Sequence, residues 1–397
     1  MLLKLRVASE TELCRKEVSV MTTDFTAVTD EAIQIRHYLH QHPEVSDQEV
    51  ATSAYLRDRL RTLGYRIITP AKLKTGVVAE LGHGHPVVAL RSDIDALPIH
   101  EATGLAYASV NPGVMHACGH DFHMASLLGA AQALKDADFA GTIRLIFQPA
   151  EETHVGAQEV MESGGAEGID AIIGFHNKPD LAAGEVGILE GGLMAAVDQF
   201  KVILHGKGTH AAKPELGRDP IVALTSLVNS LQTIVSRNVD PQAVVVLSVT
   251  HISGGNTWNV IPETASFEGT VRSFSTAGRK LAKQRFMEVV KAGAATFDVT
   301  PEIEWIKGPD VVNNDDQLTP LVAETTAKFA RVVRPVPSTT GEDFAYFSQR
   351  IPSVFAFVGS HGTSDWHHPD LKLDDQALTT GIKFFYYNAL NLLAKLR

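Results

Sequence analysis

The sequence predicts an α/β protein in which a sheet with helices on both faces forms a discontinuous larger domain. Three observations lead to this fold class. Strand-like and helix-like segments alternate as far as about residue 175, the pattern changes after Gly191-Gly192, and the first pattern returns after Gly308. Such alternation is typical of a sheet covered by helices. We therefore predict a larger domain of residues 21–191 and 309–397 that is interrupted by an inserted domain of residues 192–308.

The N-terminal segment, residues 1–20, is expected to be a loose extension. Its charged residues interrupt every apolar stretch, so it lacks the apolar core of a signal peptide. Met21 precedes the first segment with a pattern typical of folded structure. The true start of the chain is therefore either Met1 or Met21.

The first part of the larger domain contains four predicted helices and four predicted strands. Its first two helices end at His42-Pro43 and at Gly64, because proline and glycine terminate helices. Two of its strands flank Gly82–Pro86 (GHGHP), whose composition is typical of a hairpin turn. The predicted elements are helices at about 30–42, 48–63, 124–135 and 155–162, and strands at 77–81, 87–90, 142–147 and 171–175.

The inserted segment follows a different order, βαββαβ. This order is typical of a compact two-layer, ferredoxin-like domain. Its predicted elements are strand 199–205, helix 219–237, strands 243–252 and 265–274, helix 277–296 and strand 302–307. Beyond Gly308 the larger domain resumes with helix 319–332, strand 354–358 and helix 375–395.

Composition excludes several classes of function. Lys and Arg number 35 against 46 Asp and Glu, so the net charge of −11 disfavours binding to nucleic acid or to anionic lipid. No apolar run approaches the roughly 20 residues of a membrane span. The chain has only two cysteines, Cys14 and Cys118, which argues against a disulfide framework and favours the reducing cytoplasm.

Polar residues that could bind a metal recur just after predicted strands. Asp93 and Asp95 follow strand 87–90, and His367 lies in the loop after strand 354–358. The same position is occupied by Glu151, Glu152 and His176 after their own strands. In open α/β sheets ligands bind beyond the carboxyl ends of the strands, so we expect these side chains to meet at one edge.

The motif His116–His123 (HACGHDFH) is the most specific of these elements. One histidine alone is more often a surface or core residue than a ligand. Here three histidines, Cys118 and Asp121 fall within eight residues at the start of a predicted helix. Thiolate and imidazole together suit zinc or a neighbouring transition metal, so the motif predicts a metal site.

The adjacent Glu151 and Glu152 have two interpretations. They are either the acidic first turn of a helix, which complements the helix dipole, or a metal ligand beside a proton acceptor. The second interpretation is favoured, because hydrolysis by metal-activated water needs both a metal ligand and a proton acceptor.

Three residues of the inserted segment are candidates for substrate binding. His210 lies in Gly206–Pro214 (GKGTHAAKP), which lacks the Gly-Lys-Ser/Thr ending of a nucleotide-binding phosphate loop. His210 is either a polar turn residue or a contact to a substrate carbonyl. Asn259 and Arg272 are either ordinary turn and strand residues or ligands for a carboxylate, which arginine binds through two hydrogen bonds.

Taken together, the motifs resemble those of the family that contains aminoacylases, hippurate hydrolases, plant auxin-conjugate hydrolases and related carboxypeptidases. The resemblance covers nearly everything after residue 30 and is strongest to bacterial N-acetyl-amino-acid deacetylases, including the N-acetylcysteine type. Beyond the paired glutamates and the Cys118 motif, it rests on Leu39–Glu44 (LHQHPE), Arg91–Pro98 (RSDIDALP), Asn259–Pro262 (NVIP), Gly341–Phe344 (GEDF) and His367–Pro369 (HHP).

The resemblance implies a dinuclear amidohydrolase that cleaves N-acyl amino acids with two divalent ions of Zn, Mn, Co or Ni. It implies Glu151 as general base, and a homodimer or larger homo-oligomer formed through the inserted lid. His210 would stabilise the oxyanion across the dimer, and Asn259 and Arg272 would bind the substrate carboxylate. The implied metal ligands are Cys118, His120, Glu152, His176 and His367.

Two positions depart from the wider family. Cys118 replaces the usual bridging aspartate, in agreement with the hippurate and auxin-conjugate branch, and Asp93 replaces a metal-binding histidine, so Asp93 and Asp95 are expected to support the ligands. His367 is preferred to His368 as a ligand from its spacing to Pro369. A dipeptidase, a carboxypeptidase, a hippurate hydrolase or a protein that only binds N-acyl amino acids are the alternatives. Glu151 argues against the last, since binding needs no second carboxylate.

Overall fold

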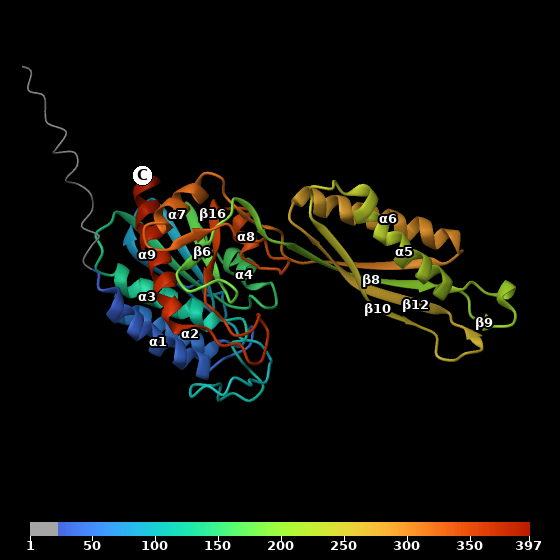
Figure 1. Cartoon of the computed structure of the whole chain (residues 1–397), viewed down its shortest axis with the longest axis horizontal. Helices are drawn as coiled ribbons and strands as arrows, with labels where there is room; N and C mark the ends of the chain where they lie inside the picture. Colours follow the sequence, from blue (N-terminus) through green and yellow to red (C-terminus); the bar gives the residue numbers. More distant parts are fainter. Residues whose placement is uncertain (1–22) are drawn as a thin grey trace, which may run out of the picture.

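The computed structural model describes residues 23–397, so the expectation for residues 1–20 lies outside the described residues. The chain forms two parts, which Figure 1 shows side by side. We call the part built on an eight-stranded sheet the large lobe and the part built on a four-stranded sheet the small lobe. The predicted α/β class is confirmed.

The large sheet has a parallel centre, in which β3 pairs with β4 and β5, and β5 pairs with β16. Carboxyl ends of neighbouring parallel strands lie at one edge, which positions the residues that follow them. In spatial order the strands are β1 (Arg66–Ile67), β2 (Val77–His83), β4 (Gly141–Gln148), β3 (Val87–Asp93), β5 (Ala171–Lys178), β16 (Ser353–Gly359), β6 (Glu185–Gly187) and β15 (Arg331–Val333).

The prediction of a hairpin around Gly82–Pro86 is wrong. Strands β2 and β3 do not pair, because β4 lies between them and bonds to both. The backbone N–H of Thr142 donates to the carbonyl of Pro86, so the start of β4 packs directly against the turn. Gly141 permits this approach, since a Cβ there would lie 2.5 Å from the Pro86 oxygen.

Helices cover both faces of the large sheet. On β3 the side chains of Val88 and Leu90 join a core cluster with α1, α3 and α9, whereas Ala89 joins a second cluster with α4 and α8. Successive strand residues point to opposite faces, which explains why Val87–Leu90, the first four residues of β3, are all apolar. The helices are α1 (Phe25–Gln41), α2 (Val50–Thr62), α3 (His120–Leu134), α4 (Gly156–Glu162), α7 (Leu318–Thr326), α8 (Ala345–Ser348) and α9 (Leu378–Lys395).

One predicted helix is too long. The segment 319–332 was expected to be helical throughout, but α7 ends at Thr326 and Arg331–Val333 forms the edge strand β15. The β-branched pair Val332-Val333 favours a strand. Arg331 also pairs with Glu185 at 2.7 Å, and this ion pair joins β15 to its neighbour β6.

The small lobe is a two-layer structure. Along β8 and β12 buried residues alternate with more exposed ones. The buried set, which includes Phe200 and Phe267, packs against α5 and α6, where Phe286 of α6 joins the same core cluster. Figure 1 shows both helices on the same face of this antiparallel sheet, whose order is β10-β12-β8-β13. In chain order the elements are β8 (Ala196–His205), α5 (Pro220–Asn238), β10 (Val245–Gly254), β12 (Thr264–Ser273), α6 (Thr276–Thr296) and β13 (Thr300–Lys307).

Two short strands, β9 (Thr209–His210) and β11 (Val260–Ile261), pair at the end of the small lobe that lies farthest from the large lobe (Figure 1). The connections between the lobes lie at the opposite end, where β7 (Gly191–Met194) pairs with β14 (Val312–Asn314). Arg279 of α6 holds these connections together, since its guanidinium bonds to Asp198 on one side and to the carbonyl of Gly308 on the other.

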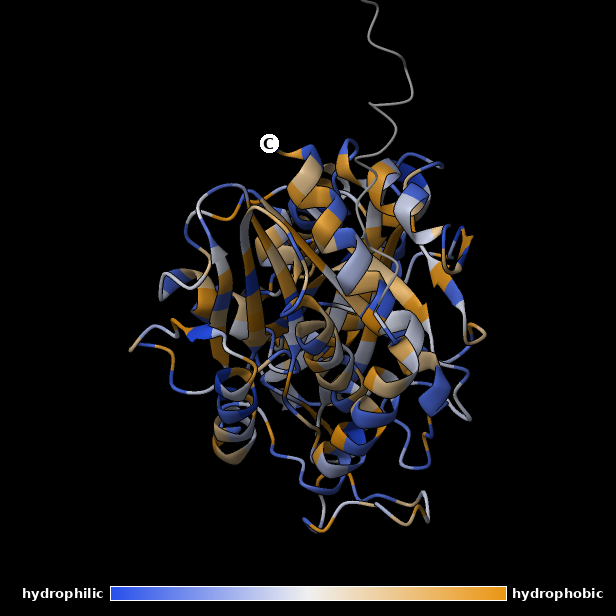
Figure 2. Ribbon diagram, turned by 90° about the vertical axis from the view of Figure 1, so that its left-hand side faces the viewer, coloured by the Kyte–Doolittle hydropathy of each residue, from blue (hydrophilic) through white to orange (hydrophobic). Residues whose placement is uncertain are grey.

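Apolar residues concentrate on the packed strands and helix faces of the interior, whereas many hydrophilic residues lie on peripheral loops (Figure 2). Within residues 23–397, no helix combines the length and the hydropathy needed to cross a bilayer.

Candidate metal centre

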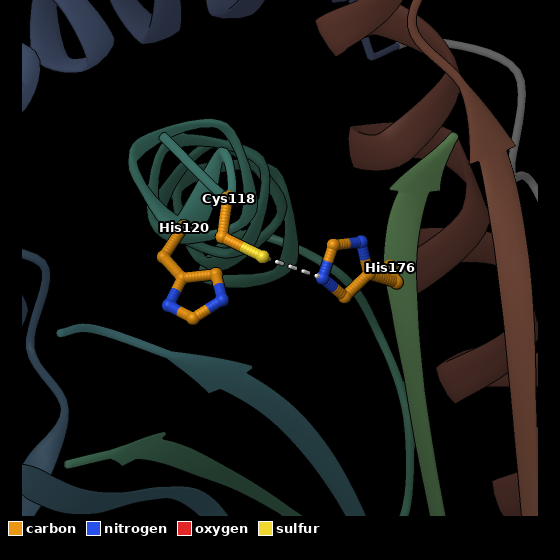
Figure 3. A group of neighbouring side chains, drawn as sticks. All are labelled: Cys118, His120 and His176. Atoms are coloured by element: carbon orange, nitrogen blue, oxygen red, sulfur yellow. Dashed lines mark hydrogen bonds between the residues drawn. The ribbon is translucent and has the colours of Figure 1, made fainter. Parts of the chain in front are cut away.

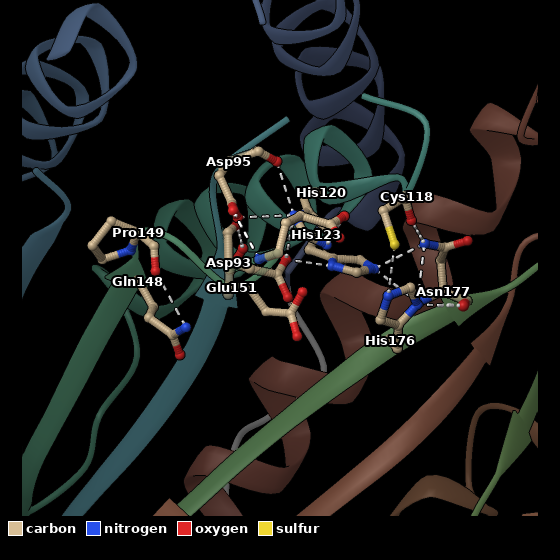
Figure 4. Close-up of polar contacts among 12 residues, drawn as sticks. Asp93, Asp95, Cys118, His120, His123, Gln148, Pro149, Glu151, His176 and Asn177 are labelled. Carbon is tan, nitrogen blue, oxygen red and sulfur yellow. Dashed lines mark hydrogen bonds and ion pairs between the residues drawn. The ribbon is translucent and has the colours of Figure 1, made fainter. Parts of the chain in front are cut away.

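The predicted metal-binding side chains converge at the carboxyl edge of the parallel strands (Figure 4). Asp93 ends β3, His176 lies near the end of β5, and His367 lies in the loop after β16. Cys118 and His120 come from the first turn of α3 and the loop before it. Donor atoms from these residues and the paired glutamates form overlapping groups, each within 4.8 Å: Cys118, His120 and His176; Cys118, Glu152 and His367; and His120, Glu151 and Glu152.

Cys118 and His176 form a buried pair of donors. Their Sγ and Nε2 atoms lie 3.4 Å apart, and Figure 3 shows the two side chains approaching from the start of α3 and from β5. The Nδ1 of His176 bonds to the carbonyl of Asn177 at 2.8 Å, which directs Nε2 towards Cys118. Burial raises the pKa of the Cys118 thiol well above its usual range, so metal binding there would displace a proton.

Glu152 faces two of the histidines. Its Oε1 lies 3.9 Å from Nε2 of His120, and its Oε2 lies 3.5 Å from Nε2 of His367. Among the described residues, neither Nε2 of His120 nor Oε1 of Glu152 has a hydrogen-bond partner, although both atoms are buried. Buried polar atoms are rarely left unpaired, and a thiol, imidazoles and a carboxylate suit zinc and its neighbours. These residues therefore fit a bound transition metal.

Asp95 supports both of these donors. Its backbone carbonyl accepts from Nδ1 of His120 at 2.9 Å, which leaves Nε2 free for a metal. Its Oδ2 accepts the backbone N–H of Glu152 at 2.9 Å and the hydroxyl of Ser46 at 2.7 Å. Burial alone would lower the pKa of His120, but the carboxylates of Asp93 and Asp95 raise it to about 10.

Glu151 makes its hydrogen bond beside a buried carboxylate pair, Glu342 and Asp343. Its Oε1 accepts the backbone N–H of Asp343 at 3.3 Å. Burial first, and then the charge of Glu342, raise the pKa of Glu151 well above its usual range. Arg91, which is fully buried, partly balances this cluster by donating to Glu342 at 2.9 Å and to Asp343 at 3.0 Å.

The structure excludes the simpler interpretation of the two glutamates as an acidic first helical turn. The helix α4 begins only at Gly156, and Glu151–His154 form a turn before it. Ala150 and His154 adopt left-handed backbone conformations there, with φ of 52° and 60°. The turn lets adjacent residues point to different partners, which a regular helix start would not allow.

His367 and His368 are clearly distinguished. Nε2 of His367 lies 3.5 Å from Oε2 of Glu152, whereas Nδ1 of His368 bonds to Asp370 at 2.6 Å. His367, and not His368, therefore shares a group of donor atoms with Cys118 and Glu152.

Two of the three small-lobe candidates lie away from the metal-binding residues of the same chain. His210 is exposed on β9, and Asn259 is next to β11 at the far tip of the small lobe (Figure 1). Arg272, near the other end of β12, is close enough to the large lobe to lower the pKa of His154, after burial as the main cause. Within one chain, Arg272 therefore lies towards the candidate metal centre, whereas His210 and Asn259 do not.

The sequence patterns assigned no individual role to Arg91, Asn177, Glu342 or Asp343, and they counted His123 only as one histidine of the metal-site motif. Each lies inside or next to a motif that was recognised, and that proximity is the signal that could have identified them. Their hydrogen-bond partners come from distant segments, so no local pattern reveals what they contact.

The site and the fold agree with the comparison to known protein families. Residues 89–391 match the model of "Peptidase family M20/M25/M40". This chain belongs to that family. The match covers the small lobe, most of the large lobe and every candidate ligand, base and substrate-binding residue named above.

Named relatives of this M20 family chain include two deacetylases of Bacillus subtilis (strain 168). It is 50% identical to N-acetyl-L-cysteine deacetylase, with 93% of this chain and 90% of the relative covered. It is 43% identical to N-acetylcysteine deacetylase, with coverage of 89% and 94%. Its structure is similar to that of a dinuclear metal-binding M20 peptidase of B. subtilis, with a TM-score of 0.85, 40% identity and coverage of 93% and 99%.

Proposed function

We propose that this chain is a metal-dependent amidohydrolase that removes an acyl group, chiefly acetyl, from N-acyl-L-amino acids. The observation that carries the proposal is the convergence of Cys118, His120 and Glu152 with two further histidines beside Glu151. The relatives named as deacetylases of N-acetylcysteine support acetyl as the acyl group.

The proposed metal ligands are five of the six residues whose donor atoms form the overlapping groups, all except Glu151, in a site for two divalent ions of Zn, Mn, Co or Ni. When bound, such ions would acidify a water molecule and polarise the amide carbonyl. Asp95 would orient His120 and the backbone of Glu152. Asp93 would support the site less directly, through its hydrogen bond to His123. The five ligands are Cys118, His120, Glu152, His176 and His367.

Glu151 is the proposed general base. The N–H of Asp343 holds its Oε1, so the other oxygen is left to take a proton from the attacking water. Glu151 would then pass this proton to the leaving amine nitrogen, because an amine is a poor leaving group unless it is protonated. Proton transfer of this kind typically contributes about 10² to 10⁴ in rate. Its raised pKa suits a group that must both accept and return a proton.

Substrate binding is proposed to require a second chain. Arg272 would bind the amino-acid carboxylate, while His210 and Asn259 of a partner subunit would bind the carbonyl oxygen and the carboxylate. The position of His210 and Asn259 at the tip of the small lobe supports this arrangement, since they are remote from their own chain's ligands. We therefore propose a homodimer or larger homo-oligomer formed through the small lobe.

The lobes correspond to proposed domains. Residues 21–191 and 309–397 would form the catalytic domain, and residues 192–308 a lid and dimerisation domain. The separate sheets and core clusters of the two lobes support this division. We also propose a cytoplasmic location, which the buried free thiol of Cys118 supports.

A panel of substrates tests the proposed function. Purified protein loaded with Zn, Mn, Co or Ni is assayed against N-acetylcysteine, other N-acetyl amino acids, N-benzoylglycine and unblocked dipeptides. Release of acetate from N-acetyl amino acids at the highest kcat/KM is expected. A higher kcat/KM for dipeptides would identify a dipeptidase or carboxypeptidase, and tight binding without turnover would contradict an enzymatic role.

A further inference from the structure

His123 lies behind the metal-binding residues, in the first turn of α3, and its side chain is 1% exposed. Its two ring nitrogens contact different strands. Nδ1 lies 2.6 Å from Oδ1 of Asp93 at the end of β3, and Nε2 lies 2.8 Å from the backbone nitrogen of Asn177 in β5. Both nitrogens are therefore occupied by protein groups.

These contacts determine where the proton of His123 resides. A backbone N–H can only donate, so Nε2 must accept from Asn177 and cannot carry a proton. The single proton of the neutral ring then lies on Nδ1 and is donated to Asp93. Arg91 fixes the other carboxylate oxygen of Asp93 at 2.8 Å. Arg91, Asp93, His123 and Asn177 thus form one buried chain of hydrogen bonds.

Asn177 connects this chain to two metal donors. Its side-chain nitrogen donates to the carbonyl of Cys118 at 2.6 Å, and its own carbonyl accepts from Nδ1 of His176 at 2.8 Å. Gly119 makes this contact possible, because a Cβ at that position would lie 2.4 Å from the side-chain nitrogen of Asn177. The peptide and amide of Asn177 therefore hold Cys118 and His176 relative to each other.

We propose that His123 is a positioning residue rather than a metal ligand. As a neutral ring protonated on Nδ1, it joins the Arg91-anchored carboxylate of Asp93 to Asn177 and so maintains the spacing of Cys118 and His176. The alternative is that His123 binds a metal ion together with Asp93 and His120, whose donor atoms lie close enough for this. This inference rests on the proposed metal centre.

Two substitutions separate the contacts of His123. Asparagine places its amide near the position of Nδ1, so His123→Asn keeps a donor to Asp93 and loses the acceptor for Asn177. Glutamine places its amide near Nε2, so His123→Gln keeps the acceptor for Asn177 and loses the donor. We expect His123→Asn to weaken metal binding by about 10- to 100-fold and His123→Gln to weaken it less.

Metal affinity is measured by competition with a chromophoric chelator, and metal content at saturation by elemental analysis. Both variants should still bind as many ions as the unsubstituted protein, with the cysteine-to-cobalt absorption band retained in the Co²⁺ form. His85→Asn is the matched control, because His85 pairs with Asp170 at 2.9 Å on the exposed surface, and its metal affinity should stay unchanged.

Two outcomes would overturn the inference. Loss of one ion at saturation would make His123 a ligand, and unchanged affinity in both variants would make it irrelevant to the metal site. Should the variants not fold, a crystal structure of the unsubstituted zinc-loaded protein decides, since ligation requires zinc at about 2.0 to 2.1 Å from Nε2. If the unsubstituted protein binds no metal, the proposed function fails instead.

Discussion

Glu151 and Glu152 are adjacent in the chain, yet their carboxylates have different partners. Glu151 accepts the N–H of Asp343 within a buried acidic cluster, whereas Glu152 faces the imidazoles of His120 and His367. A carboxylate among imidazoles and a thiol suits a metal ligand. A buried carboxylate with one oxygen held by a neutral donor suits a proton acceptor. The contrast leads to opposite predictions for the two glutamates.

Replacing Glu151 with Gln should lower kcat by about 10² or more, because the isosteric amide cannot accept the proton from water. Metal content should stay near that of the unsubstituted protein, since the five proposed ligands are intact. Initial rates and elemental analysis on the same preparation provide the measurement. Loss of metal from this variant would show that Glu151 is itself a ligand.

Glu152→Gln is the matched counterpart. The substitution removes an anionic donor, so the metal content after dialysis should fall, and excess metal should restore part of the rate. The same rate and metal measurements apply, with Glu151→Gln as the control of equal size and charge change. If Glu152→Gln retains its metal while Glu151→Gln loses it, the two assignments are reversed.

Removing metal should abolish activity reversibly. Dialysis against a strong chelator is expected to leave a folded, inactive protein, and Zn, Mn, Co or Ni should restore turnover. Full activity in a sample verified to be free of metal would contradict the proposed mechanism.

Metal affinity should also depend on pH. Burial raises the pKa of Glu152 to about 7 and that of the Cys118 thiol well above its usual range, so protons compete with the metal for these donors. The apparent affinity should therefore weaken as the pH falls through 7, with protons released on binding. Calorimetry in buffers of different ionisation enthalpy counts these protons, and binding without proton release would be the contrary result.

Subunit exchange tests the role proposed for His210. Glu151→Ala and His210→Ala proteins should each be inactive, but a mixed dimer pairs an intact base with an intact His210 at one of its two sites. Equal mixing should recover roughly a quarter of the wild-type rate, because half of the randomly formed dimers are mixed. Absence of recovery, despite exchange shown by differently tagged chains, would place His210 outside the partner's site.

Gly119→Ala should be strongly destabilising. The residue has φ of 86°, and the added Cβ would lie 2.4 Å from the side chain of Asn177. Gly84→Ala is the control, since Gly84 has φ of 79° with no heavy atom within 4 Å of the added Cβ. The left-handed conformation alone costs about 1 to 2 kcal/mol, so Gly119→Ala should exceed Gly84→Ala in chemical denaturation. Equal losses would mean that Asn177 moves aside at little cost.

Local sequence patterns predicted most of the helices and strands. They failed where pairing with a strand from a distant part of the chain determines the local structure. The turn Gly82–Pro86 has hairpin composition, but β4, which begins at Gly141, pairs with both flanking strands and separates them. The helix expected over 319–332 stops at Thr326, because β6 offers a pairing edge to Arg331–Val333. Neither partner strand is detectable within the segment itself.

The sequence by itself determined the α/β class and the chemical types of donor after each strand, because periodicity and side-chain chemistry are local properties. Only the tertiary structure decided that Glu151 turns to Asp343 and Glu152 to His120, and that both nitrogens of His123 are occupied. The hydrogen bond between Asp343 and Glu151 joins residues 192 positions apart. Their geometry depends on how β3, β4, β5 and the 341–344 segment pack, which no local pattern encodes.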